Sequence, residues 1–124
     1  FKEDHIAYMQ KIKAHFIEEV TKLPDCYDHS GEAPHIASIT FRGIRSEVLL
    51  HALEERGVYV SSGSACSSNK PELSGTLLNM GLTPADAEST LRFSFSTFTK
   101  EEELDYAVEQ LKELLPTLRR FVRR

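Results

Sequence analysis

Residues 90–96 read Thr-Leu-Arg-Phe-Ser-Phe-Ser, with an apolar side chain at every second position. This period of two is typical of a β-strand that packs one face on a core and turns the other toward polar surroundings. The leucine and the two phenylalanines would face the core, and Arg92 would point out of the opposite face. The segment therefore predicts a sheet that is covered by apolar packing on one side.

Two further runs predict strands of the same sheet. Ile36–Phe41 is rich in β-forming residues, and its odd-numbered residues form one apolar face. The run Val-Tyr-Val at 58–60 is shorter and leads into a segment of small polar residues. Residues 25–34 are polar and predict a loop ahead of Ile36.

Helices are predicted before, between and after these strands in the sequence. The first has apolar residues at steps of three and four and ends near Pro24. Its apolar face consists of Ile6, Met9, Ile12, Phe16, Val20 and Leu23. No clear cap precedes it, so either the natural chain continues on the N-terminal side or Asp4 caps a frayed first turn.

Three shorter or central helices follow from cap and turn residues. Ser46 is expected to cap a helix that ends at Arg56, with Gly57 just beyond its C-terminus. Residues 73–80 predict a short helix, and Pro84 stands at the first position of another.

The last helix has the clearest pattern. Thr99 and Glu102 predict a capping box at its start, and Pro116 is expected to kink it near residues 112–116. Its apolar stripe consists of Leu104, Ala107, Val108, Leu111, Leu114, Leu115, Leu118 and Phe121.

The order α-β-α-β-α-β-α, with a short helix before the last strand, predicts an α+β fold. The sheet would be small and mostly antiparallel, with helices packed on one face. A chain of 124 residues, 40% of them hydrophobic and 27% charged, suits one domain with its own core, covering residues 1–124.

Charge and cysteine content narrow the function classes. The net charge of −4 gives no electrostatic reason to expect nucleic acid or an anionic membrane as a partner. No apolar run approaches the roughly 20 residues of a membrane helix, and no secretory signal is visible. Two cysteines do not make a disulfide framework, so a reducing, cytoplasmic location is expected.

Cys66 is the first candidate for chemistry. It stands in the run Ser-Ser-Gly-Ser-Ala-Cys-Ser-Ser at 61–68, where almost no apolar neighbour would bury it. An accessible thiol among small residues suits a nucleophile or a sulfur carrier. A surface cysteine without a role is the alternative.

Arg92 is the second candidate, because the strand alternation turns it away from the core. A guanidinium in that position can hold a carboxylate through two parallel hydrogen bonds, although a solvated arginine is the simpler interpretation. Cys26 and His29 form a Cys-x-x-His pair, but no second ligand pair follows at zinc spacing, so no metal site is expected.

Taken together, these segments resemble a known family. Residues 60–68, 77–82 and 91–94 are similar to the C-terminal part of pyridoxal-phosphate-dependent cysteine desulfurases, which are class V aminotransferases. The separation of 26 positions between Cys66 and Arg92 fits the nitrogen-fixation and iron–sulfur housekeeping branch. The resemblance extends from about residue 23 onward and implies the small domain of a fold-type I enzyme.

The resemblance implies a role for each candidate. Cys66 would take the sulfur of L-cysteine as a persulfide, leaving L-alanine, and Arg92 would bind the α-carboxylate of the substrate. The sulfur would pass to an iron–sulfur scaffold or a thiolation acceptor, and the full-length enzyme would be a homodimer. Pyridoxal phosphate would be held by a larger N-terminal domain, whose Schiff-base lysine has no counterpart here, Lys70 included. The chain alone is therefore expected to bind no cofactor and to be inactive.

One stretch departs from the family pattern, and two other functions stay open. Residues 95–98 read Phe-Ser-Thr-Phe, where the family commonly has a glycine and a basic residue before the phenylalanine. The alternatives are a related class V aminotransferase or selenocysteine lyase, and a stand-alone α+β interaction module.

Overall fold

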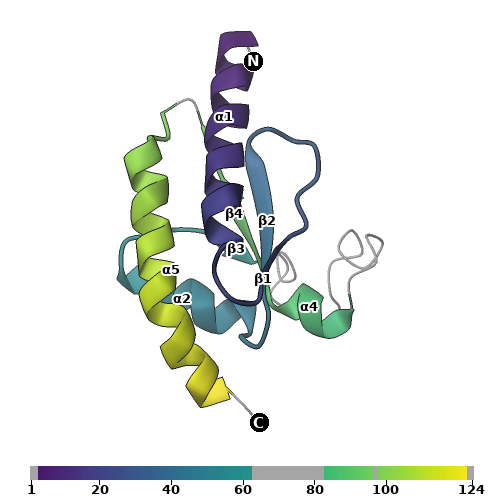
Figure 1. The fold of residues 1–124 in the computed structure, drawn as a ribbon, viewed down its shortest axis with the longest axis vertical. Coiled ribbons are helices and arrows are strands. Elements are labelled where there is room, and N and C mark those ends of the chain that lie inside the picture. The colour runs from purple at the N-terminus through teal and green to yellow at the C-terminus, as the bar shows by residue number, and fades with distance from the viewer. Residues whose placement is uncertain (1–2, 63–82, 97, 123–124) are drawn as a thin grey trace.

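The computed structural model describes residues 3–62, 83–96 and 98–122 of the chain (Figure 1). The elements are α1 (Glu3–Val20), β1 (Cys26–Asp28), β2 (Ile36–Phe41), α2 (Ser46–Glu55), β3 (Ser61–Ser62), α4 (Pro84–Glu88), β4 (Thr90–Ser94) and α5 (Glu101–Val122). The predicted helix at 73–80 lies outside the described residues.

The four strands form one sheet in the order β1-β2-β4-β3, and every neighbouring pair is antiparallel. β4 is an inner strand: Arg92 lies opposite Ser38 on β2 and opposite Ser61 on β3. The predicted α+β fold with a small antiparallel sheet is therefore confirmed.

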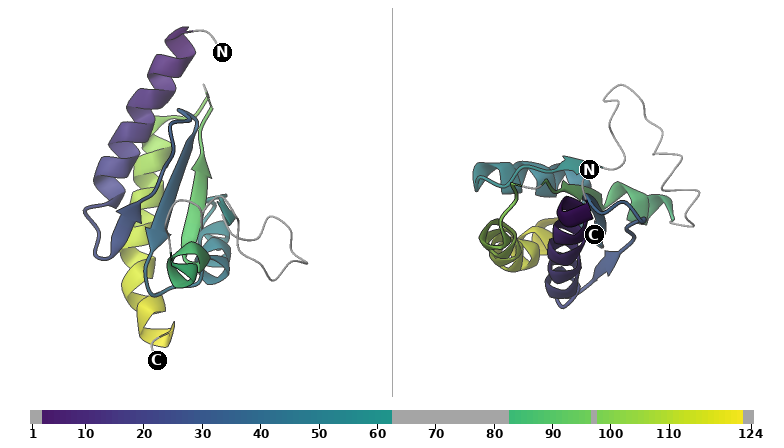
Figure 2. Two further views of the ribbon diagram at one scale, coloured as in Figure 1. Left: turned by 90° about the vertical axis from the view of Figure 1, so that its right-hand side faces the viewer. Right: turned by 90° about the horizontal axis from the view of Figure 1, so that it is seen from above.

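The core lies on one face of this sheet, as the alternation predicts. Ile39 and Phe41 of β2 and Leu91 and Phe93 of β4 are buried in one cluster with side chains of α1, α2 and α5. The Phe16 ring of α1 packs on Phe93, with 4.7 Å between the ring centroids. Figures 1 and 2 show α1 and α5 side by side over this face, whereas the short α4 lies toward the other.

Two strand predictions need correction. β1 lies inside the stretch that was expected to be a polar loop, because Cys26 pairs with Phe41 across the sheet and is only 4% exposed. Residues 58–60 form no strand, and the two-residue β3 begins just after them, at Ser61. Both strands owe their pairing to their neighbours rather than to a pattern of their own.

The helix caps also differ from expectation. Arg45, not Ser46, is the N-cap of α2, and it makes no side-chain cap hydrogen bond. The capping box at Thr99 and Glu102 is wrong by one residue, because the Glu103 carboxylate accepts the Lys100 backbone N–H at 3.0 Å. Thr99 Oγ1 instead accepts the N–H of Ser96 at 2.9 Å.

Other turn predictions are confirmed. Thr83 Oγ1 accepts the Asp86 N–H at 3.1 Å, with Pro84 following the cap. Gly57, with a φ of +86°, ends α2 in the left-handed region that favours glycine. α5 continues through Pro116 to Val122. Among the helices in the described ranges, none is long and apolar enough to cross a membrane.

Candidate functional site

Arg92 lies on the face of the sheet opposite the core, as the sequence predicts. It is half-buried at the centre of β4, between Ser38 and Ser61 on the two neighbouring strands. In the described part of the chain, no carboxylate lies within ion-pair distance of its guanidinium group. A guanidinium group presents a planar fork of N–H donors that matches the two oxygens of a carboxylate.

A hydrogen-bonded threonine pair stabilises the same face next to Arg92. Thr40 and Thr90 are fully buried, and their hydroxyl oxygens lie 2.7 Å apart. Thr90 donates its single hydroxyl proton to the carbonyl oxygen of Asp86 at 2.7 Å, so Thr40 must donate to Thr90. The register of β4 against β2 is therefore tied to the end of α4.

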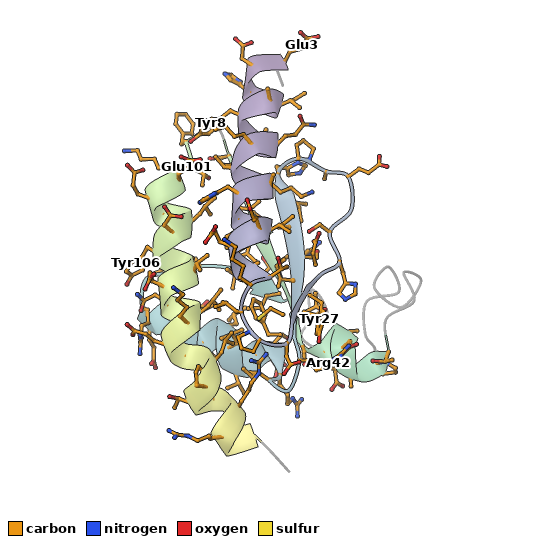
Figure 3. All side chains as sticks on the ribbon, in the orientation of Figure 1. Glu3, Tyr8, Tyr27, Arg42, Glu101 and Tyr106 are labelled. Atoms are coloured by element: carbon orange, nitrogen blue, oxygen red, sulfur yellow. The ribbon has the colours of Figure 1, made fainter. Side chains whose placement is uncertain are left out.

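An ion pair holds α4 against the turn after β2. The Arg42 guanidinium donates twice to the Asp86 carboxylate, at 3.1 and 2.8 Å, and its carbon lies 4.6 Å from the centroid of the Tyr27 ring. Hydrogen bonding from Arg42 lowers the pKa of Asp86 below its ordinary value. Figure 3 shows Arg42 and Tyr27 close together at the base of the sheet. Asp86 is therefore already paired and cannot serve as the counter-ion of Arg92.

Sequence reasoning missed this group around Arg42. Tyr27 belongs to the unpredicted β1, and Arg42 follows β2 in a turn that carries no motif. The only sequence signal near Asp86 was Pro84 at the start of a short helix, and such a signal does not indicate a tertiary partner. Cys66 lies outside the described residues, so its relation to Arg92 stays a prediction.

Cys26 is the cysteine that the structure describes, and it is unsuited to a nucleophilic role. Its Sγ lies 3.4 Å from the Pro24 carbonyl oxygen, to which the thiol donates. Burial raises the pKa of the Cys26 thiol, and the nearby Arg119 guanidinium offsets only part of that effect. Within the described ranges, no group of three or more His, Cys, Asp and Glu converges at His29 or elsewhere.

The described lysines do not form a cradle for pyridoxal phosphate. Lys13, on α1, is buried and donates to the carbonyl oxygens of Gly31 and Ala33, at 3.0 and 2.7 Å. Burial lowers the pKa of Lys13, but both carbonyl contacts hold its ammonium group in a structural position. Lys22 pairs with Glu19 on the helix surface. Neither lysine is placed to hold the cofactor, so these contacts in the described part of the chain do not fit it.

Comparisons with known proteins identify related sequences. The profile of a family described as "Aminotransferase class-V" matches residues 2–107. The chain is 37% identical to "Cysteine desulfurase IscS" of Pseudomonas putida strain W619, over 95% of this chain and 30% of the relative. It is 45% identical over 87 residues to the protein of that name from Proteus mirabilis, covering 70% of this chain and 21% of the relative.

Solved structures show the same fold. A "NifS-like protein" superposes with a TM-score of 0.78 at 24% identity, over 93% of this chain and 29% of that one. A second NifS-like protein, from Rickettsia africae, gives 0.75 at 20% identity, over 90% and 29%. The chain thus spans about 30% of the length of the first relatives it matches.

The buried state of Cys26 predicts slow thiol labelling. In a Cys66→Ala chain, Cys26 should react with a disulfide reagent at pH 8 at least ~10-fold more slowly than in the denatured chain. Because its pKa is raised, less thiolate exists at a given pH, and the rate should rise at higher pH than in the denatured chain. Equal labelling rates in the native and the denatured samples would contradict the burial of Cys26, provided that circular dichroism shows the native sample to be folded.

Proposed function

Since the chain belongs to the class-V aminotransferase family, we propose that it is the C-terminal small domain of a cysteine desulfurase. The full-length enzyme would convert L-cysteine to L-alanine and leave the sulfur as a persulfide on Cys66. The named relatives support a desulfurase over a selenocysteine lyase or a stand-alone interaction module.

One observation carries the proposal within the structure. β3 pairs with β4 at Arg92, and the chain then runs from Ser62 toward Cys66. Four residues of extended polypeptide span at most about 14 Å. Covalent connection therefore keeps the sulfur-accepting thiol within reach of the strand that carries the carboxylate-binding guanidinium.

Arg92 would orient the substrate rather than react with it. Its two parallel N–H groups match the two oxygens of an α-carboxylate. β2 and β3 pair with β4 on either side and fix the backbone of Arg92. The carboxylate would therefore be held at a defined place on the polar face. This placement would direct the rest of the substrate away from the sheet, toward the missing part of the enzyme.

The cofactor and the partners belong to the full-length protein. Pyridoxal phosphate would be bound outside these 124 residues, where it would supply the electron sink for breaking the carbon–sulfur bond. The sulfur would pass to an acceptor such as an iron–sulfur scaffold, in a cytoplasmic, homodimeric enzyme. Neither nucleic acid nor a membrane is part of the proposed function.

The Cys66 role predicts a separation of cofactor binding from sulfur transfer. In the full-length enzyme, Cys66→Ala should abolish persulfide formation, because the accepting thiolate is gone, while the absorption band of bound cofactor persists. Mass spectrometry after incubation with cysteine measures the persulfide, and Cys26→Ala is the matched control. Persulfide formation at the wild-type rate in Cys66→Ala would overturn the assignment.

The Arg92 role predicts a loss in substrate binding. Arg92→Lys keeps the charge but loses the fork, which removes one charge-assisted hydrogen bond worth about 1.5–3 kcal/mol and lowers kcat/KM about 10- to 100-fold. The loss should appear mainly as a higher KM for cysteine. Arg120→Lys, an exposed change on α5, is the control and should leave both constants near wild type. An unchanged KM in Arg92→Lys would rule out the carboxylate contact.

The proposal also predicts that the 124 residues alone are inactive. The purified chain, mixed with pyridoxal phosphate and cysteine, should form no imine absorption band and release no alanine. The full-length enzyme under the same conditions is the positive control. Alanine release by the short chain would show that the cofactor site lies within it.

A further inference from the structure

A pocket lies at the edge of the sheet, on the side away from the Arg92 side chain. Its cavity of about 430 Å³ is open to solvent and is lined by residues 57–60, the end of β4 and the first turns of α5. Phe93 and Phe95 contribute to its lining from the core face. Its size is within the range of sites that bind small molecules or peptide side chains. We call it the edge pocket.

The hydrogen-bonding pattern of β4 leaves a free backbone edge at this pocket. Phe41 donates its N–H to the Ser89 carbonyl, and Phe95 donates to the His35 carbonyl, both at 2.8 Å. The odd-numbered residues of β4 therefore bond to β2, and the even-numbered residues point to the other side. Ser94 is even-numbered, and it lines the edge pocket.

β3 is too short to cover Ser94. It pairs Ser61 with Arg92, and the same register two residues further would pair Tyr59 with Ser94. The chain diverges instead: Val58 donates its N–H back to the Leu53 carbonyl at 2.9 Å. Within the described ranges, no backbone hydrogen bond joins Ser94 to residues 58–60. One N–H and one C=O are thus left open toward the pocket.

The side chains around the edge pocket are apolar and acidic. Tyr59 is 77% exposed at its rim. Tyr106 also lines it and is held by a hydrogen bond of 2.7 Å from its hydroxyl to the Arg56 carbonyl. Glu102 and Glu103 add carboxylates on the α5 side. An occupant should therefore carry an apolar side chain and a positive charge.

We propose that the edge pocket binds an extended segment from the remaining part of the same polypeptide, which rests on the proposed function that this chain is one domain of a longer enzyme. The segment would pair with Ser94 as a short added strand. One apolar side chain would fill the cavity beside Tyr59, and a Lys or Arg would face Glu102.

Two observations favour this occupant over a separate protein. The matched relatives are about three times as long as this chain, so most of their polypeptide has no counterpart here. The first turns of α1 also lie next to the pocket, since the Tyr8 hydroxyl donates to the carbonyl of Thr99, which lines it. Figure 3 shows Tyr8 directed toward the start of α5 near Glu101. A covalently linked segment would bind at high effective concentration, so two backbone bonds can suffice.

Photo-crosslinking in the full-length enzyme tests the proposal. Benzoylphenylalanine in place of Tyr59 should give an intramolecular crosslink to a peptide outside these 124 residues, identified by digestion and mass spectrometry. The same probe in place of Val48, which is 40% exposed on α2 outside the pocket, is the matched control and should not label that peptide. A crosslink to a second copy or to another protein, or none beyond the 124 residues, would overturn the proposal.

A charge reversal tests the predicted chemistry of the occupant. Glu102→Lys should lower the Tyr59 crosslink yield several-fold, because it would repel a basic side chain at short range. Glu101→Lys changes the same helix turn but not the pocket lining, and it should leave the yield unchanged. Equal yields in both variants would contradict the basic residue. Neither readout needs turnover, so a desulfurase assay on the same samples tests the proposed function separately.

Discussion

β4 lies between β2 and β3, and its alternation of side chains determines which face of the sheet packs against the apolar core. Leu91 and Phe93 pack under α1 and α5, and the same alternation turns Arg92 outward. A shift of one residue in the pairing would bury the guanidinium in the core and expose both apolar side chains. The threonine pair at 40 and 90 and the apolar cluster thus favour the same register, and the candidate site depends on it.

The elements with a pattern of their own could be predicted from the sequence. The alternation of β2 and β4 and the apolar stripes of α1 and α5 each identify a buried face, because hydrophobic burial acts on every turn or pair of residues. β1 could not be predicted. Its three residues contain one inward side chain, Cys26, and it becomes a strand only because β2 offers an edge. Strands stabilised by a neighbour leave little trace in their own sequence.

The candidate site also contains features that the sequence predicts and features that it does not. The direction of Arg92 follows from local alternation and was predictable. The Arg42–Asp86 pair was not, because the two residues are 44 positions apart and meet only through the β2–β4 register. The capping error at α5 has a related cause. Thr99 and Glu102 have the right spacing, but the turn after β4 uses the Thr99 hydroxyl to bind Ser96, so the helix begins one residue later.

The pairing of charges on the polar face bears on what Arg92 can bind. A half-buried guanidinium loses part of its hydration, and that loss is offset only when an anion or other acceptor approaches it. The carboxylate on α4 is engaged elsewhere, because Asp86 accepts two hydrogen bonds from Arg42. The Arg42–Asp86 pair and the threonine pair therefore fix the register of the sheet without using Arg92. Under the proposed function, this would let a carboxylate bind to Arg92 and leave again without disturbing the contacts that hold the fold.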